Sequence, residues 1–330
     1  MATHVETELF SSMPTHYRRS GVVTSWSRLN RMGDPGECFI EGPVFDESGN
    51  LFITDIEYGR VFRIDPRGAW ELVAEWDGEP NGLALLGPTE LLTTDFRNGL
   101  MVVDTVSGVV TPFLDRRNTE RFRGVNDLVF DSRGNLYFTD QGTTGLHDPT
   151  GRVYRLTPDG RLDMLIGNGP SPNGLVLTPD ERFLYVAMTR ANGVWRIPLM
   201  EDGGVAKVGQ YVTMNGPGGP DGLAIDAAGR LVVALHGRGE VWVLDEKADP
   251  VVVLHSTAGS SITNVAYGGA DRRDLYCTES ATGTVLRATL DIPGAEVHPG
   301  RRGVQCAQQQ HGVSAAPATT GSSPVAPGSR

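Results

Sequence analysis

The chain has 330 residues and a formal net charge of -11, which argues against a nucleic-acid partner because phosphate binding needs a basic stripe. Its 42 glycines and 21 prolines suit many short strands joined by tight turns better than a helical protein. It has no run of 18 apolar residues and no signal-peptide core at its start, so we expect no membrane span and a cytoplasmic protein.

The cysteines and the N-terminal residues add little chemistry. Cys38, Cys277 and Cys306 include no CxxC pair, so they indicate neither a disulfide framework nor a zinc–thiolate site, and we interpret them as buried or idle thiols. Residues 1–20 are polar and aperiodic, and we expect a flexible leader or cap. Residues 22–29 alternate apolar and polar side chains, which predicts a half-buried strand.

Six related segments follow at intervals of 40 to 48 residues. Each predicts a hairpin that begins with Asn, Asp or Glu, as in NDLVFDSRGNLYFTD at residues 126–140. The segments begin at Glu41, Asn81, Asn126, Asn173, Asp221 and Asn264. This period indicates a repeat architecture.

Each repeat predicts four strands. In the first repeat these cover residues 43–45, 51–54, 60–64 and 70–74. Radial repetition of four-stranded antiparallel sheets makes a β-propeller, so we predict an all-β fold with six blades over residues 21–298. The predicted strand at 22–29 is the candidate for the outer strand that closes the ring. Residues 299–330 are rich in Ser, Ala, Pro, Gly and Thr, which predicts a disordered tail.

The first residues of the six repeats form a candidate metal site. The first strand of each propeller blade lines the central channel, so all six residues are expected near one mouth, and all carry a side-chain oxygen acceptor. Asn and Asp also favour turns before strands, which explains any one of them without a site. Six in register favour a hard divalent cation, with Ca²⁺ first, Mg²⁺ or Mn²⁺ behind and Zn²⁺ less expected. Glu41 and Asp221 would neutralise its charge.

The segments EGPVFD, VNDLVFD, SPNGLVLTPD and GPDGLAID lie within residues 35–290 and resemble the senescence marker protein (regucalcin), gluconolactonase and luciferin-regenerating enzyme family. The resemblance implies a six-bladed propeller that holds one divalent cation through Glu41, Asn126, Asn173 and Asp221. It also implies lactone hydrolysis, with Asp221 as a general base.

The sequence departs from that family at one position. Sugar-lactone members place an Arg two residues before the Asn of the NDLVFD segment, whereas here Gly124 holds that position and Arg123 sits one residue earlier. This argues against an aldonolactone and leaves γ-lactones, aryl lactones and macrolactones open beside the sugar lactones.

Hydrolysis of a cyclic ester requires a polarised carbonyl, an activated water and a stabilised alkoxide. A bound cation supplies the first and the third as a Lewis acid. A carboxylate bound to a dication is a weakened base. Either Asp221 keeps one oxygen free for the water, or a metal-bound hydroxide attacks.

Loops that follow the second strand of each blade are expected at the same mouth, and Arg190 lies in one of them. The candidate substrate contacts are Asn81, Arg123, Tyr58, Gln141, His147, His236 and Asn264. Asn81 and Asn264 are equally candidates for further metal ligands or for hydrogen-bond partners of the ligands. The Thr-Asp pairs at 54–55, 94–95 and 139–140 are interpreted as turn caps, and Asp127 as a neighbour of the ligands.

A serine hydrolase is disfavoured because no GxSxG segment follows a predicted strand. Propellers also act as scaffolds, so a non-catalytic calcium-binding or protein-interaction propeller is the alternative function. A scaffold typically exposes an aromatic or basic patch rather than a ring of carboxylates and amides. The ring therefore favours a metal-dependent lactonase with a small-molecule lactone as its partner, and the oligomeric state stays open.

Overall fold

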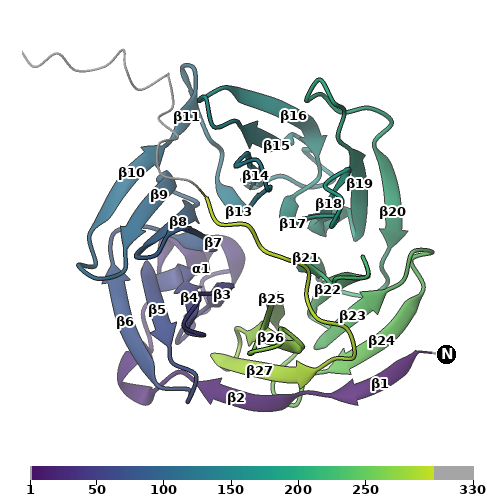
Figure 1. The fold of residues 1–330 in the computed structure, drawn as a ribbon. Coiled ribbons are helices and arrows are strands. Elements are labelled where there is room, and N and C mark those ends of the chain that lie inside the picture. The colour runs from purple at the N-terminus through teal and green to yellow at the C-terminus, as the bar shows by residue number, and fades with distance from the viewer. Residues whose placement is uncertain (1, 301–330) are drawn as a thin grey trace, which may run out of the picture.

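The structure is a computed structural model that describes residues 2–300. Six four-stranded antiparallel sheets stand around a central axis (Figure 1), which confirms the predicted six-bladed propeller. The described residues contain one short α-helix, α1 (Ser25–Asn30), and three 3-10 helices, η1 (Thr15–Tyr17), η2 (Ile56–Tyr58) and η3 (Thr189–Ala191).

The first three blades each use four consecutive strands. Blade 1 consists of β3 (Ile40–Phe45), β4 (Leu51–Asp55), β5 (Arg60–Ile64) and β6 (Trp70–Glu75). Blade 2 consists of β7 (Pro80–Gly87), β8 (Glu90–Asp95), β9 (Gly99–Asp104) and β10 (Val110–Leu114). Blade 3 consists of β13 (Val125–Phe130), β14 (Leu136–Asp140), β15 (Gly151–Leu156) and β16 (Leu162–Gly169). A small hairpin, β11 (Arg116–Arg117) and β12 (Glu120–Arg121), separates blades 2 and 3.

The last three blades complete the ring, two of them with help from the N-terminus. Blade 4 consists of β17 (Pro172–Leu177), β18 (Phe183–Met188), β19 (Gly193–Pro198) and β20 (Gly209–Thr213). Blade 5 consists of β21 (Gly219–Ile225), β22 (Leu231–His236), β23 (Glu240–Leu244) and β24 (Pro250–His255), with β1 (Thr3–Glu6) added at its edge. Blade 6 consists of β25 (Ile262–Gly268), β26 (Asp274–Glu279), β27 (Thr284–Thr289) and β2 (Glu8–Ser12).

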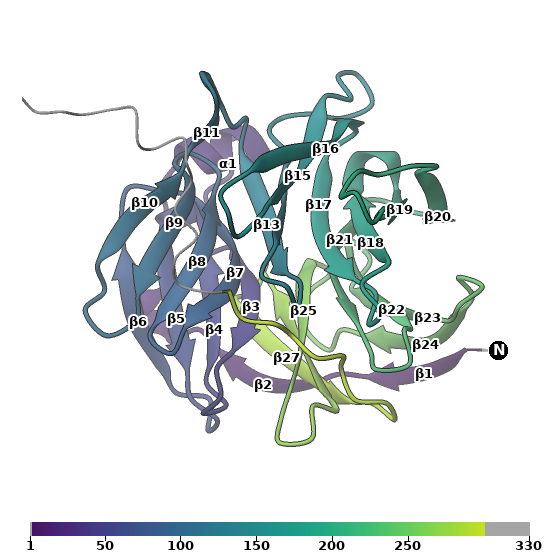
Figure 2. The same cartoon turned by 45° about the horizontal axis from the view of Figure 1, so that its top comes forward.

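The N-terminal strands fasten blades 5 and 6 together. β2 pairs antiparallel with β27 as the outer strand of blade 6, and β1 pairs parallel with β24 of blade 5. Figures 1 and 2 show both strands along the outer edge of the ring. The structure thus differs from the leader or cap expected over residues 1–20, because β27 offers an edge to pair with and Phe10 packs against Tyr276, with ring centroids 5.0 Å apart.

The prediction of a strand over residues 22–29 is wrong. The Thr24 side chain accepts a hydrogen bond from the Ser27 N–H at 3.0 Å, and the Ser27 side chain accepts one from the Thr24 N–H at 2.9 Å. This capping box starts helix α1. Trp26 on this helix is buried and packs against Phe39, with ring centroids 4.4 Å apart. Local capping therefore outweighs the alternating pattern.

Apolar side chains fill the spaces between neighbouring blades. Leu92 and Leu100 of blade 2, for example, share one buried cluster with Leu136 and Phe138 of blade 3. Each blade buries both of its faces in this way, which is why most strands carry few exposed positions. Cys38 and Cys277 are buried free thiols whose pKa is raised to about 12, chiefly by burial; Cys306 lies outside the described residues.

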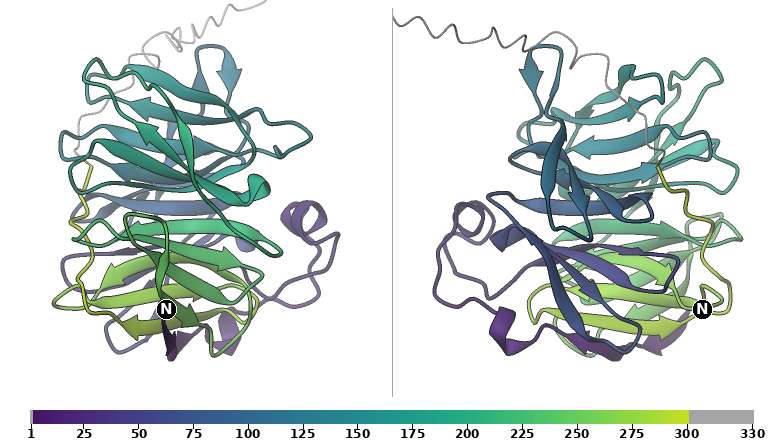
Figure 3. Two further views of the ribbon diagram at one scale, coloured as in Figure 1. Left: turned by 90° about the vertical axis from the view of Figure 1, so that its right-hand side faces the viewer. Right: turned by 60° about the vertical axis from the view of Figure 1, so that its left-hand side comes forward.

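Two segments lie on opposite faces of the propeller (Figure 3): α1 projects from one face, and residues 292–300 cross the other. The N–H of Ala295 donates to the Ile225 carbonyl at 3.0 Å, and that of Gly300 to the Leu85 carbonyl at 2.7 Å. Both carbonyls lie toward the far ends of inner strands. The remaining access is from the mouth where the inner strands begin.

The division of the chain into a propeller over 21–298 and a tail over 299–330 stays a prediction, and the tail lies outside the described residues except for 299 and 300. Within the described part, none of the helices has the length and hydropathy that crossing a membrane requires.

Candidate functional site

Every inner strand carries a bulge near its acceptor residue. In β7, Pro80 pairs with Asp95 and Leu83 pairs with Thr93, so Asn81 and Gly82 lie opposite one residue. The pairing shifts in the same way in β13, β17 and β21, whereas in β3 the shift falls just after Glu41 and in β25 just before Asn264. A bulge re-aims a side chain out of the regular alternation. The bulge thus re-aims Asn81, Asn126, Asn173 and Asp221.

Glycines next to the acceptors let neighbouring inner strands approach closely. A Cβ on Gly174 would lie 2.4 Å from the carbonyl oxygen of Asp221, and a Cβ on Gly222 would lie 2.1 Å from Oδ1 of Asn264. Only glycine fits such an approach. The Asn-Gly and Asp-Gly pairs in the sequence therefore reflect packing around the channel as well as turn formation.

Threonine hydroxyls fasten three of the six acceptor residues to the preceding blade. Oγ1 of Thr54 donates to the Asn81 carbonyl at 2.7 Å, and Oγ1 of Thr139 donates to the Asn173 carbonyl at 2.9 Å. Thr94 makes the same contact with the carbonyl of Asn126. These threonines were interpreted as turn caps. Their role between blades was missed, because their separation from the next acceptor varies from 27 to 34 residues and gives no fixed spacing to recognise.

The Asp of each Thr-Asp pair does bind backbone. Oδ1 of Asp140 accepts the N–H groups of Arg123 and Gly124 at 2.7 and 2.8 Å, and Oδ1 of Asp95 accepts the Glu79 N–H at 3.1 Å. These contacts hold the chain just before it enters the inner strand, so this part of the turn-cap interpretation is confirmed.

The ring contains two buried carboxylates within electrostatic reach of each other. Burial, and next the charge of Asp221, raises the pKa of Glu41 well above its usual value, while hydrogen bonds from the Gly42 N–H and the Asn264 side chain lower it. Burial also raises the pKa of Asp221 to about 7; a hydrogen bond from Asn173 acts in the opposite direction. Two buried carboxylates are costly to ionise unless a positive charge joins them.

An amide oxygen in the ring has no partner. The Asn126 side-chain N–H donates to Oε1 of Gln141 at 3.0 Å, and the Gln141 side-chain N–H donates to Oγ of Ser171 at 2.9 Å. Oδ1 of Asn126 is left buried with no hydrogen bond within the described residues. A buried oxygen of this kind normally has a partner.

These features fit a hard divalent cation. Glu41, Asn126, Asn173 and Asp221 come from four blades and offer oxygen donors, including the unpaired one of Asn126. Within residues 2–300 no group of three or more His, Cys, Asp or Glu side chains could hold a metal ion, so such a site depends on the amide oxygens.

The other ring residues lie beside this set. Asn264 accepts the Val265 N–H on its Oδ1 at 2.8 Å and hydrogen-bonds to Glu41, so it orients that carboxylate. Asn81 is half-buried. Asp127 has its pKa raised to about 7 by burial, and its charge in turn raises the pKa of Glu41 and Asp221.

The comparisons with known proteins identify the family. A family model described as SMP-30/Gluconolactonase/LRE-like region matches residues 39–307. The chain belongs to this family. The resemblance read from the sequence is thereby confirmed. A curated member, lactonase drp35 of Staphylococcus saprophyticus, is 31% identical over 256 residues, which cover 72% of this chain and 76% of the relative.

Solved structures of the SMP-30/gluconolactonase type share the fold. Regucalcin from Agrobacterium tumefaciens, described as a calcium-binding protein, aligns with a TM-score of 0.72 and 21% identity over 91% of this chain and 99% of its own. A gluconolactonase from Xanthomonas campestris aligns with a TM-score of 0.66 and 24% identity over 78% and 86%. At these identities the likeness shows the fold alone.

Two predicted contact residues of this SMP-30/gluconolactonase family member are engaged away from the ring. The Tyr58 hydroxyl donates to the carbonyl of Gly36, and the exposed Arg123 side chain donates to Oγ1 of Thr150. Gln141, in contrast, is joined directly to Asn126.

Helix α1 sits beside the mouth on two buried carboxylates. Thr24 donates to Oε1 of Glu57 at 3.1 Å, Ser25 donates to Oε1 of Glu79 at 2.9 Å, and Nη1 of Arg31 lies 3.6 Å from Oε2 of Glu57. Burial is the main cause that raises the pKa of both glutamates. This family member thus has a helical cap at the rim that the sequence pattern did not reveal.

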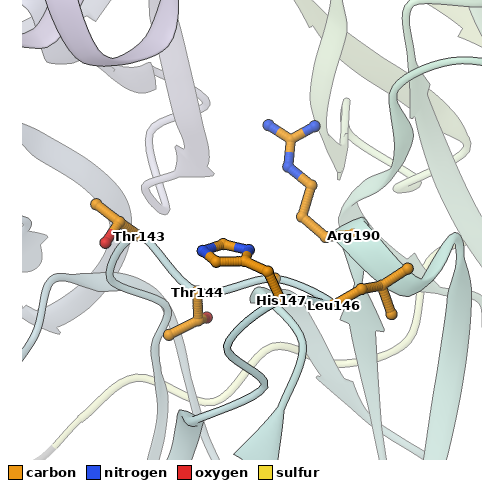
Figure 4. A pocket seen from close by; sticks show the side chains of 6 residues that line it. Thr143, Thr144, Leu146, His147 and Arg190 are labelled. Atoms are coloured by element: carbon orange, nitrogen blue, oxygen red, sulfur yellow. The ribbon is translucent and has the colours of Figure 1, made fainter.

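His147 and His236 lie on the same side of the ring as Arg190. An open pocket of about 500 Å³ is lined by residues 143–147 and Arg190 (Figure 4). Burial, and next the charge of Arg190, holds the pKa of the half-buried His236 below its usual value.

Proposed function

We propose that this protein is a metal-dependent lactonase that opens a cyclic ester at the mouth of its central channel. The observation that carries the proposal is the unpaired buried oxygen of Asn126 in the same ring as the buried carboxylates of Glu41 and Asp221. The names of its relatives support the reaction: drp35 is a lactonase and the X. campestris neighbour a gluconolactonase.

The proposed cation ligands are Glu41, Asn126, Asn173 and Asp221. Ca²⁺ is the first choice because every donor is an oxygen, and Mg²⁺, Mn²⁺ and Zn²⁺ follow. The regucalcin neighbour, described as calcium-binding, agrees with this order. When bound, the cation supplies Lewis-acid polarisation of the lactone carbonyl and stabilises the charge of the leaving alkoxide.

The residues of the chain supply orientation and proton transfer. Asn173 hydrogen-bonds to the Asp221 carboxylate and thereby fixes its orientation. We assign to Asp221 the role of the base that accepts a proton from the attacking water, because burial raises the affinity of this carboxylate for a proton. Gln141 holds the Asn126 amide so that its oxygen faces away from Gln141. The strap of residues 292–300 leaves the α1 side of the channel as the route for substrate.

A lactone panel followed with a pH indicator tests the proposal on protein of measured metal content. We expect lactone opening that stops on chelation and returns with Ca²⁺. Asp221→Asn should lose at least about a hundredfold in kcat while still binding the cation. Asp202→Asn, an exposed aspartate on a distant loop, is the matched control and should keep full activity.

A metal-loaded protein that opens no lactone would support the alternative, a non-catalytic calcium-binding or protein-interaction propeller. Full turnover by Asp221→Asn with its metal in place would remove Asp221 as the base and leave the lactonase proposal standing.

A further inference from the structure

The pocket beside the ring presents the guanidinium of Arg190, which has no partner among the described residues, to any ligand that enters it. We propose that Arg190, together with the loop of residues 143–147, binds an anionic substituent of the substrate, so that the preferred substrates are lactones that carry a carboxylate. This inference rests on the proposed function, because it assigns the part of the substrate that lies outside the ester ring.

The backbone fixes Arg190 next to the ring on one side. Oγ1 of Thr189 donates to the carbonyl of Pro220 at 2.7 Å. A Cβ on Gly219 would lie 2.4 Å from the Thr189 carbonyl oxygen, so the two segments are in close contact. Arg190 follows Thr189 directly, and Asp221 follows Pro220. The guanidinium therefore extends from a point fastened to the start of the strand that carries Asp221.

The other wall of the pocket is fastened to the ring as well. Oγ1 of Thr144 donates to the Gln141 carbonyl at 2.6 Å and accepts the Ser171 N–H at 3.1 Å. Gln141 in turn holds the side chain of Asn126. The loop is therefore tied to two proposed cation ligands, since Asn126 is held through Gln141 and Asn173 follows Ser171 by two residues.

The two walls meet at Gly145. Its N–H and carbonyl pair with Asp148 at 3.1 Å in both directions, which makes a tight turn at this point. A Cβ on Gly145 would lie 3.2 Å from Nδ1 of His147 and 3.6 Å from Cβ of Arg190. Figure 4 shows His147 and Arg190 reaching into the same opening from their separate loops.

The chemistry of the lining favours an anion. Its side chains are the hydroxyls of Thr143 and Thr144, the imidazole of His147, the guanidinium of Arg190 and the apolar Leu146, with no carboxylate among them. This is unusual for a chain with a net charge of -11. A substrate carboxylate would meet the guanidinium of Arg190 and a threonine hydroxyl, and the hydrocarbon part of the substrate would contact Leu146.

Arg190 is free to make such a contact. Within residues 2–300 its guanidinium makes no hydrogen bond or ion pair, whereas Arg152 pairs with Glu120 and Arg155 with Asp163 at 2.5 and 2.6 Å. An arginine fork binds a planar carboxylate through two parallel hydrogen bonds. An exposed arginine that lines a pocket and lacks an internal partner is therefore suited to a carboxylate supplied by the ligand.

A matched pair of substrates tests this inference on the metal-loaded protein. One is γ-butyrolactone-γ-carboxylate, and the other is its carboxamide, which has the same ring and nearly the same size without the charge. We expect the wild-type protein to prefer the acid in kcat/KM. Arg190→Ala should lower the acid-to-amide ratio of kcat/KM by about ten- to a hundredfold, mainly through KM, as expected for one charge-assisted contact.

Two further variants separate recognition from a general effect on the site. Arg190→Lys keeps the charge and should restore part of the ratio. Arg182→Ala removes an exposed arginine just before β18, at the end of that strand opposite to Arg190, and should leave the ratio at its wild-type value.

The outcomes distinguish this inference from the proposed function. Equal kcat/KM for acid and amide in the wild type, or an equal loss on both in Arg190→Ala, would overturn the preference for acidic lactones while the lactonase function stands. A metal-loaded protein that opens neither of these substrates nor any other lactone would overturn both.

Discussion

Gln141 accepts a hydrogen bond from the side-chain N–H of Asn126 at 3.0 Å and thereby decides which end of that amide faces away from it. The oxygen that remains is buried and has no partner among the described residues. A neighbour that orients a metal ligand typically changes metal affinity by ten- to a hundredfold when it is removed.

Gln141→Ala should therefore lower the affinity for Ca²⁺ by about tenfold or more, because the Asn126 amide is then free to rotate. Titration calorimetry on metal-stripped protein measures this. Gln210→Ala replaces an exposed glutamine on the outer strand β20 and serves as the control. Unchanged affinity in Gln141→Ala would show that the Asn126 oxygen does not bind the cation.

Thr139→Val should destabilise the protein by about 2 to 4 kcal/mol. Its hydroxyl accepts the Asp127 N–H at 3.0 Å and donates to the Asn173 carbonyl at 2.9 Å, so valine leaves two buried backbone groups unpaired between blades 3 and 4. Urea unfolding measures the loss. Thr111→Val on the exposed face of β10 is the matched change and should alter stability by less than about 0.5 kcal/mol; equal effects would contradict the inter-blade role.

Arg60→Ala should cost about 3 to 5 kcal/mol. The Arg60 side chain is 2% exposed and its Nε donates at 2.9 Å to Asp55, whose side chain is fully buried, so the variant leaves a carboxylate without its charge partner. Arg63→Ala breaks the exposed pair with Glu71 and should cost at most about 1 kcal/mol. Similar losses in the two variants would mean that the buried pair contributes nothing beyond a surface contact.

Glu57→Gln should stabilise the protein at neutral pH relative to acidic pH. Burial raises the pKa of Glu57 above its ordinary value of 4.5, so the folded state binds the proton more tightly than the unfolded state. Stability therefore falls as the pH rises from that value through the folded-state pKa, and the uncharged amide removes this loss.

Thermal unfolding at about pH 4.5 and about pH 8 measures the difference, and the gain in Tm of the variant over wild type should be larger at the higher pH, by a few degrees. Glu47→Gln, an exposed glutamate in blade 1, provides the baseline. A gain that is the same at both pH values would exclude Glu57 as its source.

The blades and the acceptor residues of the ring could be predicted from the sequence because each repeat contains the same local pattern. Every inner strand carries an acceptor such as Asn173 close to its start, followed in most copies by a glycine that close packing requires. Both features lie within a few residues of each other, so a single sequence displays them.

Features that depend on distant partners were not accessible. The five residues of β2 form a strand because β27 offers its edge, and that partner lies at the other end of the propeller. Residues 22–29 show an alternating pattern, but the reciprocal bonds of Thr24 and Ser27 select a helix, without the Glu or Gln that usually marks such a cap. The proposed role of Arg190 in binding a carboxylate depends on a pocket that two loops from different blades form together.

The pairing of β2 with β27 also determines when the last blade can be completed during synthesis on the ribosome. β2 ends at Ser12 and leaves the ribosome early, whereas β27 ends at Thr289, so β2 has no strand to pair with in blade 6 until almost the whole propeller has been synthesised. The proposed cation ligands come from four blades, so the nascent chain has no complete set of them until residue 221 has emerged. Cation binding is then expected to appear only late in synthesis.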